Sequence, residues 1–141
     1  MFGSDRGELR AMYAEAWQRR RAGRPLTSLQ TQIADVIAEH PEYHEALSPD
    51  ESARDYAPDG GRTNPFLHMG LHLAVRDQVA TDRPQGIRGV FERLAAAEGS
   101  AHAAEHRMID CLAEALWQAQ RDGTAPDEAG YLERLRSLPG R

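Results

Sequence analysis

Histidine is the residue type whose spacing in this sequence points most directly to chemistry. All six histidines fall into pairs four residues apart: His40 with His44 in HPEYH, His68 with His72 in HMGLH, and His102 with His106 in HAAEH. Random placement of six histidines among 141 positions predicts only about 0.2 such pairs. On a helix, residues four apart share a face, with Cβ atoms about 5–6 Å apart. Two imidazoles placed in this way can bind one metal ion.

The apolar residues around each pair predict that the imidazoles face the interior. His40 continues a stripe that includes Ile33 and Ile37, and His72 is in line with Val75. Since a buried imidazole needs a polar partner, six of them turned inward favour a shared metal site. A structural or pH-sensing histidine cluster and unrelated placements remain as alternatives. The first pair has the least certain angle, because Pro41 separates its two histidines.

Carboxylates near the pairs are further candidate ligands. Glu98 and Glu105 are the favoured ones, and Glu105 is also the candidate general base. Glu98, His102 and His106 continue to Asp110 in steps of four, although Gly99 is expected to end a helix directly after Glu98. Other acids in the chain are expected to be solvated helix-face charges. Arg76 follows His72 by four residues and is expected to reach solvent rather than pair with an acid.

The candidate ligands limit which metal ions the site would suit. Imidazoles with some carboxylate suit transition metals, with zinc or iron expected, better than Mg²⁺ or Ca²⁺. Because six histidines exceed the needs of one tetrahedral ion, one or two ions are expected. We therefore predict a metal-dependent protein, with hydrolysis or oxygen activation as its candidate reactions. The alternatives are a non-catalytic metal-binding or sensing protein and a pH-responsive interaction module.

A period of 3.6 residues and capping signals predict an all-α fold, a bundle of four main helices with two or three short ones. Expected boundaries include an Asp5–Glu8 capping box, a cap at Thr27 or Ser28, and a helix restarted by Asn64 and Pro65. That helix is apolar all round, so we expect it to be central and buried. Ser100 and Gly123 bound the longest helix, Pro126 opens the last one, and residues 48–63 read as a loop.

The remaining reactive and aromatic side chains are expected to be structural. Cys111 is the single cysteine, and its place on an apolar helix predicts a buried, inert thiol. The tryptophans, Trp17 and Trp117, lie at helical spacing and are expected in the core.

Composition excludes several broad classes of function. The chain has 141 residues, enough for a single domain spanning 1–141, and a formal net charge of −5. That charge argues against nucleic acid as the main partner. The sequence offers neither a membrane-spanning apolar run nor a secretory leader, so we expect a cytoplasmic protein without a membrane partner. A small-molecule ligand and a homodimer remain open.

Five segments together resemble a family of small bacterial proteins catalogued as the domain of unknown function 1841. They are MFGSDRGELRAMYAEAW, IADVIAEHPEYHEAL, TNPFLHMGLHLAVRDQ, AHAAEHRMIDCLAEALW and YLERLRSL. The resemblance covers nearly the whole chain and implies a bacterial, single-domain, soluble protein without an established activity. In architecture the chain also resembles hemerythrin-like and DinB-like bundles, which hold metals with histidines on helices. It departs from the hemerythrin pattern, where His and Glu alternate, because each pair here consists of two histidines.

Overall fold

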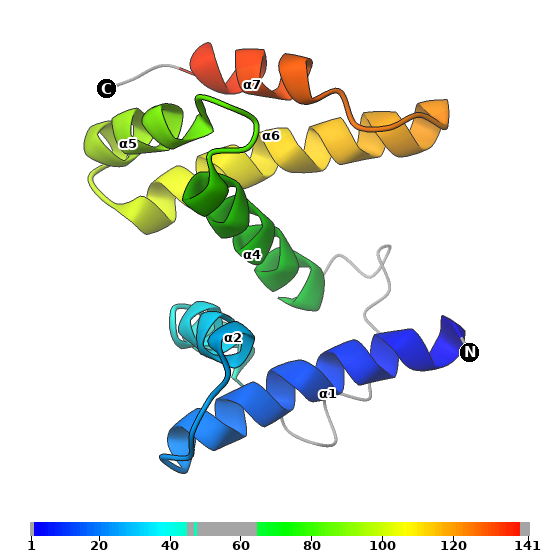
Figure 1. Cartoon of the computed structure of the whole chain (residues 1–141), viewed down its shortest axis with the longest axis vertical. Coiled ribbons are helices and arrows are strands. Elements are labelled where there is room, and N and C mark those ends of the chain that lie inside the picture. The colour runs from blue at the N-terminus through cyan, green and yellow to red at the C-terminus, as the bar shows by residue number, and fades with distance from the viewer. Residues whose placement is uncertain (1, 45–46, 48–64, 139–141) are drawn as a thin grey trace. The chain divides into compact units, whose positions relative to one another are not determined.

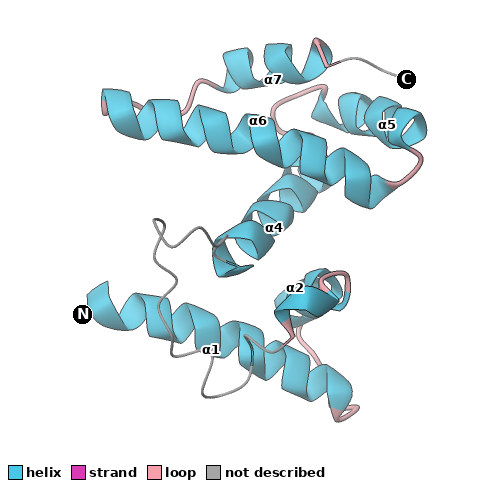
Figure 2. Ribbon diagram, turned by 180° about the vertical axis from the view of Figure 1, so that it is seen from behind, coloured by secondary structure: helices cyan, strands magenta, loops and turns pink. Residues whose placement is uncertain are grey.

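The computed structural model describes residues 2–44, 47 and 65–138, and every regular element in that part of the chain is helical. The elements appear in the order α1 (Phe2–Arg21), α2 (Ser28–Ala38), the short 3₁₀ helix η1 (Pro41–Tyr43), α4 (Pro65–Thr81), α5 (Ile87–Glu98), α6 (Ala101–Asp122) and α7 (Glu128–Arg136) (Figures 1 and 2). The predicted all-α class is confirmed. The count of four main helices in one bundle stays a prediction. The expected loop at 48–63 and the cap at Asn64 lie outside the described residues.

The chain forms two compact units, residues 1–73 and 74–141, and the boundary falls within the continuous helix α4. Among the described residues, none of the helices combines the length and the apolar character that a membrane span requires.

In the first unit, α1 and α2 pack against each other and against the first half of α4. Their buried core contains Tyr13, Ala16, Ile33, Val36, Ile37, Leu47, Phe66 and Met69. The Tyr13 and Phe66 rings meet edge to face with centroids 5.8 Å apart, which fixes the start of α4 on α1. Removal of these side chains from water supplies the main stabilisation of this unit.

Local signals set the ends of α2. The Thr27 side chain accepts a hydrogen bond from the Gln30 backbone N–H at 3.1 Å, and the Gln30 side chain accepts one from the Thr27 N–H at 2.9 Å. This reciprocal capping box confirms Thr27 as the cap. At the other end, α2 stops before His40 and Pro41, because proline disfavours helix for the residue before it.

In the second unit, α5 and α7 both pack on α6, and α7 folds back along it (Figure 2). The Asp82 carboxylate accepts hydrogen bonds from the backbone N–H groups of Gly86 and Arg88, which lowers the Asp82 pKa and anchors the start of α5. Gly99 and Gly123 end α5 and α6 in the left-handed conformation, as predicted, with φ of 87° and 67°.

Four expectations about local structure were wrong or incomplete. The backbone of α1 already begins at Phe2, so Asp5 lies inside the helix. The last helix starts at Glu128, with Asp127 as its cap, because the Asp127 carboxylate accepts from the Gly130 N–H at 3.0 Å.

The other differences concern burial. Leu67 is 61% exposed, so α4 is not buried on all sides. Trp117 is 55% exposed, with the Arg121 guanidinium 4.8 Å above its ring, whereas Trp17 packs against the core of the first unit. Helical spacing fixes which side chains share a face, but burial depends on which helix packs there.

Candidate metal centre

The first half of α4 brings His68 and His72 together on consecutive turns. Phe66 and Met69 anchor this stretch in the core of the first unit. The Nε2 atoms of His68 and His72 are 3.1 Å apart, and the ring centroids are 4.7 Å apart. The His72 side chain is completely buried and His68 is half-buried. The predicted i, i+4 contact is therefore confirmed for this pair.

His40 reaches the same place from the end of α2. It lies between α2 and η1 and is 1% exposed. Its Nδ1–H donates a hydrogen bond to the Val36 carbonyl at 2.7 Å, because a carbonyl oxygen can only accept. In the neutral ring this bond leaves the lone pair on Nε2, the tautomer that a metal ligand needs. The Val36 carbonyl thus orients the His40 ring, as backbone carbonyls commonly do for histidines that bind a metal.

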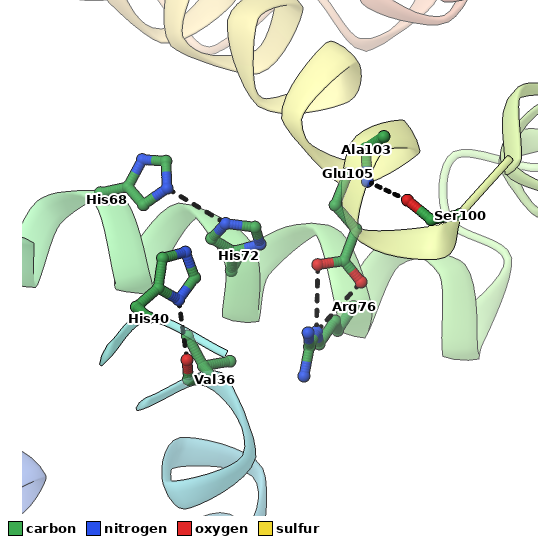
Figure 3. A network of polar contacts seen from close by, with 8 residues as sticks. All are labelled: Val36, His40, His68, His72, Arg76, Ser100, Ala103 and Glu105. Carbon is green, nitrogen blue, oxygen red and sulfur yellow. Dashed lines mark hydrogen bonds and ion pairs between the residues drawn. The ribbon is translucent and has the colours of Figure 1, made fainter. Parts of the chain in front are cut away.

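The three imidazoles of His40, His68 and His72 form one cluster, which we call the three-histidine cluster (Figure 3). The His40 ring centroid is 5.1 Å from that of His68 and 4.6 Å from that of His72, and each of these ring pairs meets edge to face. Each residue offers one ring nitrogen, and the three nitrogens lie within 4.8 Å of one another.

The spacing of the His68 and His72 nitrogens matches that of two ligands on one ion. With metal–nitrogen distances of about 2.0–2.1 Å, two nitrogens on the same ion lie about 2.9–3.4 Å apart for angles between square and tetrahedral. The 3.1 Å separation of the His68 and His72 Nε2 atoms falls inside that range. The His40 nitrogen lies within 4.8 Å of both. Three neutral imidazoles are a ligand set that zinc, copper, iron and nickel all accept.

Tyr43 is a residue at this site that sequence reasoning missed. Its ring stacks on His40 at 9° with centroids 5.3 Å apart, and its centroid is 6.0 Å from that of His68. Burial and the neighbouring Glu42 charge raise the pKa of Tyr43. The signal lay within HPEYH, because a proline-initiated turn brings the third residue after His40 back beside it.

His44, the partner of His40 in the sequence, points elsewhere. Its Nε2–H donates to the Ile37 carbonyl at 3.0 Å, and its ring lies on Trp17 with centroids 4.6 Å apart. Its ring nitrogens do not belong to the three-histidine cluster. The first pair is split because Pro41 replaces the α-helix by a 3₁₀ turn, in which residues four apart no longer stack.

The third pair lies at the start of α6 in the second unit. The Ser100 hydroxyl caps the helix by accepting from the Ala103 N–H at 3.0 Å (Figure 3). The His102 and His106 ring centroids are 4.3 Å apart, so the predicted contact is confirmed. However, His106 is exposed and His102 half-buried, so the expectation that this pair faces a core was wrong for His106.

The two favoured carboxylates are both held by arginines. The buried Glu105 carboxylate accepts from the Arg76 Nε–H, at 3.2 Å and 3.0 Å to its two oxygens (Figure 3). The expectation that Arg76 reaches solvent was therefore wrong. Glu98 pairs with Arg107. Because α5 ends at Glu98, this residue is not on the helix of His102, and the expected unbroken series of four-residue steps does not form. The roles of Glu98 and Glu105 toward a metal stay predictions.

The buried thiol was predicted correctly. Cys111 is 6% exposed, and burial raises its pKa. Cys111 lies on the buried face of α6.

Comparisons with known proteins assign the chain to a family. No curated protein and no solved structure matches the chain. The similarity to hemerythrin-like and DinB-like bundles therefore stays a prediction. The model of the family described as "Domain of unknown function (DUF1841)" matches residues 5–137, nearly the whole chain. The protein belongs to the DUF1841 family.

Proposed function

We propose that this protein binds a transition-metal ion in the three-histidine cluster and uses it for hydrolysis. The observation that carries the proposal is the meeting of the His40, His68 and His72 ring nitrogens, with 3.1 Å between the two on α4. Zinc is the ion that such a set favours, because three imidazoles in tetrahedral geometry leave one position for water.

The chain's own residues prepare the ligands. The Val36 carbonyl holds the His40 ring in the tautomer with its lone pair on Nε2. Tyr43 covers the face of that ring. Burial of His40 and His72 excludes water from their side of the cluster, so the imidazoles bind in a surrounding of low polarity. A bound zinc ion would supply a Lewis acid and a water molecule whose pKa is lowered to about 7.

Hydrolysis would require an exchangeable position on the ion beside the three imidazoles. Structural zinc sites close four protein ligands around the ion, whereas catalytic sites use three and keep an exchangeable position. The expectations that Glu105 acts as the general base and that His44, His102 and His106 are metal ligands stay predictions. Non-catalytic metal sensing and a pH-responsive interaction stay alternatives.

Elemental analysis of untagged full-length protein, purified without chelator or added metal, tests the proposal. We expect about one equivalent of ion to be lost in the double variant His68→Ala, His72→Ala. His44→Gln is the matched control, because His44 belongs to the same sequence motif as His40 but not to the cluster. Its metal content should equal that of the wild type. Unchanged metal content in the double variant would remove α4 from the site.

A second measurement separates catalysis from structure. Azide added to the Co²⁺-loaded His102→Ala, His106→Ala variant, which keeps the three-histidine cluster, should change its visible spectrum if the ion in that cluster keeps an exchangeable position. An unchanged spectrum would identify a closed, structural site and contradict hydrolysis.

A further inference from the structure

The start of α6 presents a second group of metal-binding side chains. We propose that His102 and His106 hold a second transition-metal ion, beside which Glu105 supplies a negative charge. The site is formed by residues of the second unit. It is an exchangeable site at the surface, since His106 is exposed.

The helix fixes the two imidazoles relative to each other. Both belong to the first two turns of α6, which Ser100 caps. Their ring centroids are 4.3 Å apart. Two imidazoles four residues apart on a rigid helix can ligate one ion with only side-chain rotation.

Glu105 places a carboxylate oxygen near this pair. A carboxylate oxygen of Glu105 and a ring nitrogen of His102 lie within 4.8 Å of each other. The Arg76 guanidinium fixes that carboxylate at 3.0 Å and keeps it in place although it is buried. A carboxylate so held can accept a hydrogen bond from water on the ion, which is the common role of an acid beside a metal. The order His-x-x-Glu-His also occurs on the zinc-binding helix of one class of metallopeptidases.

Zinc binding to the full-length protein tests the second site. In equilibrium dialysis of metal-free protein against Zn²⁺, the wild type should bind two equivalents per chain. The double variant His102→Ala, His106→Ala should bind one, and its fold should be intact because alanine favours helix and His106 is exposed. Glu105→Gln should weaken the second equivalent by roughly 10- to 100-fold.

A matched control lies on the same helix. Glu114 and Gln118 are also four residues apart, and they are joined by an exposed hydrogen bond of 3.0 Å. The double variant Glu114→Ala, Gln118→Ala should still bind two equivalents. It controls for the loss of a side-chain contact on α6.

The outcomes separate this site from the proposed function. A His102→Ala, His106→Ala variant that binds as much zinc as the wild type overturns the second site. So does a folded variant that binds none, because its histidines would then share one ion with other residues. If the wild type binds one equivalent that this variant loses and the His68→Ala, His72→Ala variant keeps, the second site stands and the three-histidine centre fails.

Discussion

The Nε2 atoms of His68 and His72 lie 3.1 Å apart on consecutive turns of α4. In the absence of an ion, one of the two nitrogens has to donate to the other. An ion bound as we propose would replace that bond and accept a lone pair from each nitrogen. The two nitrogens are already at ligand distance, so metal binding would need little ordering of their side chains.

Zinc should therefore raise the thermal stability of the protein. An ion that binds only the folded chain stabilises it by about 2.7 kcal/mol when its free concentration is 100 times its dissociation constant. The melting temperature should rise with Zn²⁺ in the wild type and in His44→Gln. The increase should be smaller in His72→Ala, because that variant lacks one ligand. Equal increases in all three proteins, measured by circular dichroism, would contradict binding at His72.

The Arg76–Glu105 pair should be needed for stability of the second unit. The Glu105 side chain is 7% exposed, and Arg76 26%. Arg76→Leu removes the guanidinium from a buried carboxylate, and we expect the free energy of unfolding to fall by about 3 kcal/mol. The double variant Arg76→Leu, Glu105→Leu should recover most of that loss, because it buries no charge. Urea denaturation measures both, and a single variant as stable as the wild type would refute the prediction.

Stability should fall at high pH because of Tyr13. Burial raises the pKa of Tyr13 to about 12, from 10.0. Between these two pH values the folded chain keeps a proton that the unfolded chain releases, so the free energy of unfolding decreases as pH rises. The decrease due to Tyr13 approaches about 3 kcal/mol, from about 1.4 kcal/mol per pKa unit.

Comparison with Tyr13→Phe isolates this effect. The difference in unfolding free energy between wild type and variant should be constant below pH 10 and should change between pH 10 and 12. The other tyrosines titrate in both proteins and cancel. A difference that stays constant to pH 12 would mean that Tyr13 ionises normally in the folded protein.

Two glycines should respond to alanine in opposite directions. Gly89 lies within α5 and has no neighbour within 4 Å of an added Cβ, so Gly89→Ala should stabilise by about 0.5–1 kcal/mol. Gly123 ends α6 with φ of +67°, which an L-residue rarely adopts, so Gly123→Ala should destabilise by about 1 kcal/mol. Chemical denaturation of both variants checks the signs, and the same sign for both would contradict these backbone assignments.

The sequence predicted most helix ends because capping is local. Thr27, Ser100, Gly99 and Gly123 act where expected, since each cap depends on backbone groups within a few residues. For the same reason the contacts within the His68–His72 and His102–His106 pairs could be predicted from spacing alone.

The parts of the site that could not be predicted depend on distant residues or on backbone detail. Arg76 meets Glu105 across 29 positions of sequence, and no local pattern specifies which acid an arginine reaches. The separation of His44 from His40 depends on the form of one turn after Pro41. The exposure of His106 depends on which face of α6 is packed, a question that helical periodicity alone does not answer.

The burial of Cys111 affects which ligand atoms the folded chain offers to a metal ion. Thiolate is the strongest ligand that most proteins offer to zinc and copper, and it is also the species that oxidises. The Cys111 thiol is buried, and its raised pKa keeps it protonated. If metal binds as we propose, its ligands are nitrogen and oxygen atoms, and the chain's single sulfhydryl group is not among them.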